Sequence, residues 1–174
     1  YPKLLAPIHK HAIELGGATG SYGTQPEITI FEGSDGTKIG TAICYESVYG
    51  DYYRDYILKG AQVMSIITND GWWSNTPGYR QHLRYASLRA IETRRSIARS
   101  ANTGISAFIN QRGERVAELG WWHEDCLTGS INLNNELTFF VRHGDFIGRI
   151  STFMFTLLAL LYFTIAVTKR AKKK

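Results

Sequence analysis

The chain has 174 residues, of which 44% are hydrophobic and 20% charged, so it is long enough for one globular domain with a sizeable core. Its formal net charge is +5, and five of the positive side chains lie in residues 169–174. The rest of the chain is roughly neutral, which argues against nucleic acid as a partner.

The amino-terminal stretch YPKLLAPIHK has no initiating Met and no charged-then-apolar leader. We therefore expect no signal peptide, and we expect the chain to be a fragment of a longer protein. The glycine-rich stretch GGATGSYGTQPE follows. It lacks the GxxxxGK[ST] pattern and precedes no helix signal, so it is predicted to be an ordinary loop without a phosphate site.

Strands and helices alternate from here to about Gly148, which predicts an α/β fold. The predicted strands are rich in Ile, Val, Thr and Phe and are bounded by Gly, Asn or Asp. They are Glu27–Phe31, Lys38–Ile43, Gln62–Ile67, Gly104–Asn110, Arg115–Leu119 and Leu127–Leu133. Within INQRGERV, the pair Arg112-Gly113 is predicted to form a hairpin turn.

Two helices are predicted, Val48–Leu58 and Tyr79–Ser96. The second has apolar positions at helical spacing and many arginines, most of which we expect on a solvated face.

The carboxyl terminus predicts a membrane span. Residues Ile150–Val167 contain 18 consecutive uncharged residues, which as a helix would extend about 27 Å, close to the thickness of a bilayer's hydrocarbon core. The basic tail TKRAKKK follows at once. The positive-inside rule places this tail in the cytoplasm and the preceding domain across the membrane, which in a bacterium is the periplasm.

The stretch AICYES places Cys44 at the end of a predicted strand, just before a predicted helix. Such an elbow exposes a side chain near backbone N–H groups, which favours a thiolate and makes Cys44 a candidate nucleophile. Glu46 either positions a substrate amine or a base, or only lies favourably at the helix start. Neither His82 nor His123 is placed near Cys44 by the sequence, and both are expected to be surface or structural histidines. Cys126 has no feature beyond that of an ordinary structural cysteine, and the two cysteines have no metal-ligand spacing.

A second cluster follows the apolar run in AQVMSIITND, where Asn69 precedes the adjacent pair Trp72 and Trp73. Loops at the carboxyl ends of strands line the sites of α/β proteins. Two neighbouring tryptophans in such a loop are expected to be covered, either by the core or by lipid.

Three stretches together resemble the carbon–nitrogen hydrolase (nitrilase) superfamily: GTAICYES, TNDGWWSNTPGYRQHLRYASLRAIETRRSIARSANTGISAFI and NQRGE. Within the superfamily, the chain is more similar to the bacterial membrane-bound branch, the apolipoprotein N-acyltransferase family. The terminal span strengthens this resemblance, because the catalytic domain of that family is followed by its last transmembrane helix.

The resemblance implies a nitrilase-like α-β-β-α sandwich, present in part, with a Glu–Lys–Cys triad and no metal or cofactor. Cys44 matches the nucleophile, and Tyr45 and Glu46 match the two following positions, where the glutamate is also needed for activity. Asn69, Trp72 and Trp73 match the loop beside the site. The implied reaction moves an acyl chain from a phospholipid to the cysteine as a thioester. The chain then passes to the N-terminal amine of a diacylglyceryl-cysteine lipoprotein.

The resemblance also implies that the base glutamate lies upstream of this chain. Tyr1 and Lys3 match the lysine motif only superficially, and we expect the catalytic lysine to be absent. The predicted parts are then a carboxyl-terminal portion of a catalytic domain in residues 1–148, a transmembrane helix in 150–167 and a basic tail in 168–174. Two alternatives remain open: a membrane-anchored amidase of the same superfamily, and a membrane-anchored binding module without activity.

Overall fold

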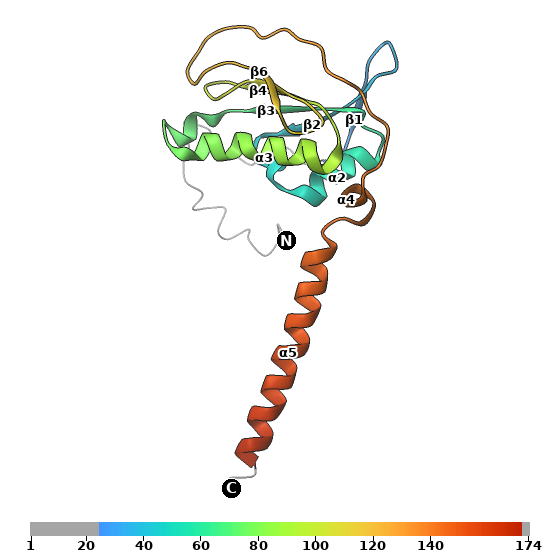
Figure 1. Ribbon diagram of the computed structural model, residues 1–174, viewed down its shortest axis with the longest axis vertical. Coiled ribbons are helices and arrows are strands. Elements are labelled where there is room, and N and C mark those ends of the chain that lie inside the picture. The colour runs from blue at the N-terminus through green and yellow to red at the C-terminus, as the bar shows by residue number, and fades with distance from the viewer. Residues whose placement is uncertain (1–24, 172–174) are drawn as a thin grey trace.

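The computed structural model describes residues 25–171, and at its centre is a six-stranded mixed sheet in the order β1-β2-β3-β4-β5-β6 (Figure 1). Strands β2, β3 and β4 are parallel, whereas β1, β5 and β6 each join antiparallel to their neighbours. The strands are β1 (Ile30–Glu32), β2 (Lys38–Ile43), β3 (Val63–Thr68), β4 (Ile97–Ala101), β5 (Ala107–Ile109) and β6 (Arg115–Glu118).

Helices α2 (Gly50–Leu58) and α3 (Pro77–Thr93) lie on one face of this sheet, and the short α4 (Phe139–His143) lies beside α2 (Figure 1). Two short 3-10 helices, η1 (Cys44–Val48) and η2 (Asp70–Trp73), follow β2 and β3 directly. Alternate residues of the parallel strands face the helices and are buried, as expected from the period of two along a strand. The core between the two layers contains Ala42, Met64, Ile66, Ile97, Tyr53, Ile57, Leu83, Ala86 and Ala90.

Helix α3 begins and ends where local chemistry dictates. The Thr76 side chain accepts from the Gly78 N–H and Pro77 occupies the first turn, a common helix start. Arg94 adopts a left-handed conformation with φ 51°, which stops the helix at Thr93, before the expected end at Ser96. The chain then enters β4, a strand that the sequence analysis missed because Arg99 interrupts its apolar pattern.

The arginines on and just after α3 do not all face solvent, which corrects the expectation of a solvated face. Arg89 is buried and pairs with Glu92 at 2.7 Å, and Arg95 is buried with its guanidinium donating to backbone carbonyls, including that of Ala61. A buried guanidinium is tolerated because its donors find fixed acceptors.

The opposite face of the sheet is only partly covered. Phe31, Ile43 and Ile67 project from it and are 58%, 61% and 52% exposed. The described residues therefore form one sheet with helices on one side, which is one α-β half of the predicted four-layer sandwich.

The predicted strand Leu127–Leu133 is wrong, because this segment forms no strand. It belongs to a long connection between β6 and α4 that arches past the sheet (Figure 1). Gly129 lies against the ring of Phe108, on the sheet face away from the helices, so the segment crosses a face instead of pairing along an edge. The other predicted strands and both helices are confirmed, with ends shifted by up to three residues. The hairpin turn is also confirmed, with Gly113 at φ 81°.

Helix α5 (Phe146–Ala171) projects away from the rest of the structure (Figure 1). Its segment Phe146–Lys169 has a mean hydropathy of 2.1 and is not buried against other described residues. By length and composition it is able to cross a membrane.

Candidate active site

The carboxyl ends of the three parallel strands bring the predicted site residues to one edge of the sheet. Cys44 follows β2 and Asn69 follows β3, and these strands pair in register with Ile43 opposite Ile67. Ligand and catalytic groups of open parallel sheets gather at this edge. The elbow predicted at Cys44 is therefore confirmed in position.

The elbow itself is sharp. Cys44 has φ 53°, in the left-handed region that a residue with a Cβ adopts only at a cost, and it opens η1. Its side chain is partly exposed, whereas Cys126 is exposed on the β6–α4 connection; both thiols are free. The strained backbone turns the Cys44 side chain out of the strand direction, as a nucleophile at a strand end requires.

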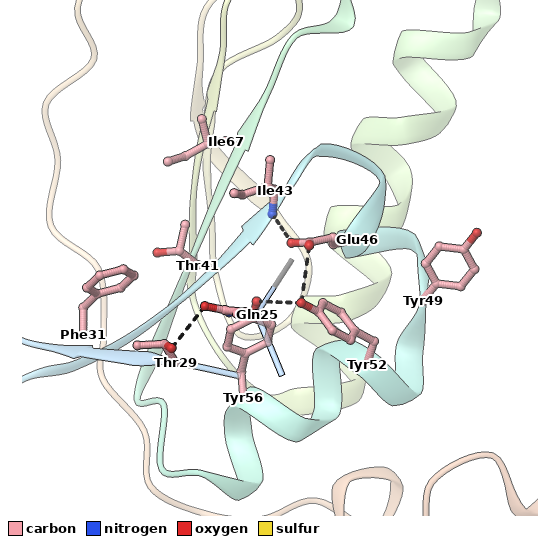
Figure 2. A pocket seen from close by; sticks show the side chains of 10 residues that line it. All are labelled: Gln25, Thr29, Phe31, Thr41, Ile43, Glu46, Tyr49, Tyr52, Tyr56 and Ile67. Carbon is pink, nitrogen blue, oxygen red and sulfur yellow. Dashed lines mark hydrogen bonds between the residues drawn. The ribbon is translucent and has the colours of Figure 1, made fainter. Parts of the chain in front are cut away.

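Glu46 both caps the elbow and faces a cavity. One carboxylate oxygen, Oε2, accepts from the backbone N–H of Ile43 at 2.7 Å, and Oε1 accepts from the Tyr52 hydroxyl at 3.3 Å (Figure 2). The first contact closes the turn between the strand and η1. The second orients the carboxylate, so both roles weighed for Glu46 have a geometric basis.

The cavity beside Glu46 has a volume of about 980 Å³ and is wide enough for an extended ligand. Figure 2 shows apolar side chains on the sheet side and three tyrosines on the side of α2. Burial and the hydrogen bond with Tyr52 raise the pKa of Tyr56, so its hydroxyl stays neutral. Its lining residues are Gln25, Thr29, Phe31, Thr41, Ile43, Glu46, Tyr49, Tyr52, Tyr56 and Ile67.

Tyr45 points to a different place. It lines a small cavity of about 70 Å³ together with Trp73, His82 and Tyr85, and its ring lies 6.0 Å from that of His82. Tyr45 and Trp73 are thus brought together, next to Cys44 but apart from the larger cavity.

The tryptophan pair is not covered by the core of the described residues, which corrects one of the two expectations. Trp72 and Trp73 are 51% and 38% exposed. Asn69 stands at the start of η2, where its side chain accepts from the Gly71 N–H at 3.0 Å and so shapes the loop that presents the two rings.

Beneath Cys44 lies a buried polar cluster that the sequence analysis missed. Asp70 accepts from Arg99 at 2.6 Å and from the His82 ring nitrogen Nδ1 at 2.9 Å, and Thr68 donates to the same carboxylate. Burial acts to raise the pKa of Asp70, but the hydrogen bond from His82 and the Arg99 guanidinium together hold it below its usual range. Asp70 is therefore a carboxylate near neutral pH. The one signal for this cluster was a charged residue directly after an apolar strand.

The other ring nitrogen of His82, Nε2, lies 3.2 Å from the Cys44 carbonyl oxygen and 3.2 Å from the Ser47 hydroxyl. His82 is thus a satisfied structural histidine, as expected, but it contacts the elbow, which the sequence did not indicate. His123 is exposed. Within residues 25–171, no hydrogen bond reaches the Cys44 thiol, and no group of three or more His, Cys, Asp or Glu side chains is arranged to hold a metal ion.

This arrangement agrees with comparisons to known proteins. Residues 5–136 match the family model of the carbon–nitrogen hydrolases, so the chain belongs to this family. The chain is also similar to proteins named apolipoprotein N-acyltransferase. It is 35% identical over 150 residues to that of Chlorobaculum tepidum, covering 85% of this chain and 28% of the relative. With the Geobacter metallireducens protein it shares 30% over 143 residues, covering 82% and 26%.

Solved structures of the nitrilase superfamily resemble the model in fold. Nit3 of Saccharomyces cerevisiae, with 21% identity, gives a TM-score of 0.49 over 59% of this chain and 40% of that protein. An amidase from Nesterenkonia sp. AN1, with 22% identity, gives 0.47 over 60% and 42%. The chain spans little more than a quarter of the length of the two acyltransferases that it matches.

Proposed function

We propose that this chain is the carboxyl-terminal part of a membrane-bound N-acyltransferase that acylates the N-terminal amine of lipoproteins. The observation that best supports the proposal is the Cys44 elbow beside the cavity that Glu46 lines, in a chain similar to apolipoprotein N-acyltransferases. Residues 1–148 would form the catalytic portion, 150–167 the membrane span and 168–174 a cytoplasmic tail.

The proposed reaction has two steps at Cys44. The thiolate attacks the ester carbonyl of a phospholipid, a thioester forms, and the lysophospholipid leaves with the ester oxygen as its hydroxyl. The amine of a diacylglyceryl-cysteine then attacks the thioester, an amide forms, and the thiolate is released. Because no described hydrogen bond reaches the Cys44 thiol, the base for these proton transfers is assigned to residues outside the described segment.

The cavity suits the acyl chain, and Glu46 suits the amine. Phe31, Ile43 and Ile67 offer apolar contact surface, and the Glu46 carboxylate lies at the rim next to Cys44. A cavity of about 980 Å³ in the described half also leaves room for a second sheet to close over it. The missing half of the family's sandwich would complete the site in the full-length protein.

Helix α5 supports a membrane location, and the exposed Trp72 and Trp73 agree with contact to lipid at the interface. We place the catalytic portion in the periplasm of a bacterium, with the inner membrane as its site, on the charge of the terminal tail. Both proposed substrates are membrane lipids or lipid-anchored, so a site tethered by a span reaches them without extracting them.

The test uses the full-length protein incubated with phospholipid, followed by mass spectrometry of the intact enzyme. Cys44→Ala should abolish a thioester adduct, whereas Cys126→Ala, the matched change at the exposed thiol, should retain it. Loss of the adduct in Cys126→Ala with retention in Cys44→Ala would overturn the assignment. Discharge of the adduct to water, with no transfer to a lipopeptide amine, would instead identify an amidase-like hydrolase.

A further inference from the structure

The backbone of Cys44 is held in an unfavourable conformation, so something nearby must hold it there. A non-glycine residue at φ 53° persists only where its surroundings over-determine it. The Glu46 cap fixes the residue before Cys44, through the N–H of Ile43. The carbonyl of Cys44 has separate partners: the Ser47 hydroxyl donates to it at 2.8 Å, and Nε2 of His82 lies 3.2 Å away.

These partners are themselves fixed from below. Ser47 and His82 are 1% and 3% exposed, and Asp70 is fully buried. Because Asp70 is ionised, its oxygen accepts the proton on Nδ1 of His82, which orients the ring and points Nε2 at the elbow. Arg99 and Thr68 hold the carboxylate in turn, so the chain of contacts runs from β4 through β3 and α3 to the nucleophile elbow.

We propose that Asp70 and His82 form a positioning pair that locks the carbonyl of Cys44 and so aims its thiol at the acyl carbon. The inference rests on the proposed role of Cys44 as nucleophile. His82 acts through the backbone and does not serve as the base, because Nε2 faces the Cys44 carbonyl and the Ser47 hydroxyl. Its ring is committed on both nitrogens, which leaves none directed at the thiol.

Three substitutions test this pair in the full-length protein. In His82→Asn the amide reaches only the position of Nδ1, so the contact with Cys44 is lost. In His82→Gln the longer side chain carries an amide to the position of Nε2 and can donate to the same carbonyl. Ser47→Ala removes the second donor with little change in volume, and it remains informative if His82→Asn fails to fold. His123→Asn makes the same chemical change on an exposed histidine and is the control.

Two readouts are needed. The first is the ¹³Cα resonance of Cys44 in ¹³C-cysteine-labelled protein, assigned as the signal that disappears in Cys44→Ala; it reports backbone conformation without any substrate. The second is acyl transfer to a lipopeptide, separated into kcat and KM. We expect His82→Asn and Ser47→Ala to move the resonance and to lower kcat about tenfold at nearly unchanged KM, the effect of one lost buried hydrogen bond. His82→Gln should recover most of both, and His123→Asn should change neither.

The inference is overturned if folded His82→Asn or Ser47→Ala keeps the wild-type resonance, whatever happens to kcat. It is also overturned if the resonance moves while kcat stays within twofold. Failure of the proposed function is distinguishable, because a wild-type protein without acyl transfer would still show the resonance shifts on substitution. A transfer-competent protein whose resonance ignores both substitutions would keep the function and lose the positioning pair.

Discussion

Asp70→Asn should destabilise the protein by about 3–5 kcal/mol, because it breaks a buried ion pair and leaves a charge behind. The carboxylate accepts from Arg99, His82 and Thr68, and the side chains of Asp70, Arg99 and His82 are nearly inaccessible. An asparagine oxygen can still accept from His82 and Thr68, but its NH₂ group then faces the guanidinium donors. The opposite amide orientation satisfies Arg99 and loses the other two contacts. Either way a buried donor is left unpaired.

The assay is urea unfolding of the full-length protein in detergent, followed by tryptophan fluorescence, with Glu118→Gln as the control. Glu118 pairs with Arg115 on the surface at 2.6 Å, with both side chains nearly half exposed, so its loss should cost under about 1 kcal/mol. The two substitutions make the same chemical change in opposite environments. If Asp70→Asn shifts the free energy of unfolding no more than Glu118→Gln, the buried cluster does not have the energetic role assigned to it.

The same carboxylate sets an acid limit: because the folded pKa of Asp70 is lowered, its stabilisation is complete above about pH 4 and is lost as pH falls through the folded pKa, a dependence that Asp70→Asn should lack in acid titrations of unfolding free energy. Gly104→Ala should destabilise by about 1–3 kcal/mol in the same urea assay, because a Cβ there would overlap the Asp70 carboxylate, and an unchanged midpoint would contradict this close contact. Glu46→Gln keeps an acceptor for its backbone partner and should cost about 1 kcal/mol or less, yet slow acyl transfer by about 10²–10⁴-fold; near-normal turnover would reduce Glu46 to a cap. A reporter fused after Lys174 should read as cytoplasmic, and a periplasmic signal would refute the proposed topology.

The sequence by itself determined the features that depend on neighbours along the chain. Strand β2 begins and ends where the pattern predicted, and the elbow follows it at Cys44. The apolar helix near the carboxyl terminus and the hairpin turn at Gly113 were equally legible. Each of these reflects a local cause: alternation along a strand, an unbroken apolar run, or a glycine that tolerates a positive φ.

Tertiary structure alone decided which distant residues meet. Asp70 is 12 residues from His82 and 29 from Arg99, and the three come together only because adjacent parallel strands and α3 share one edge. The same packing hid β4, whose Arg99 looks unsuited to a buried strand until its carboxylate partner is in place. It also misplaced Leu127–Leu133, an apolar stretch that lies over a face of the sheet. Local patterns report how a segment prefers to fold, whereas the burial of a charge depends on partners that only the assembled layers supply.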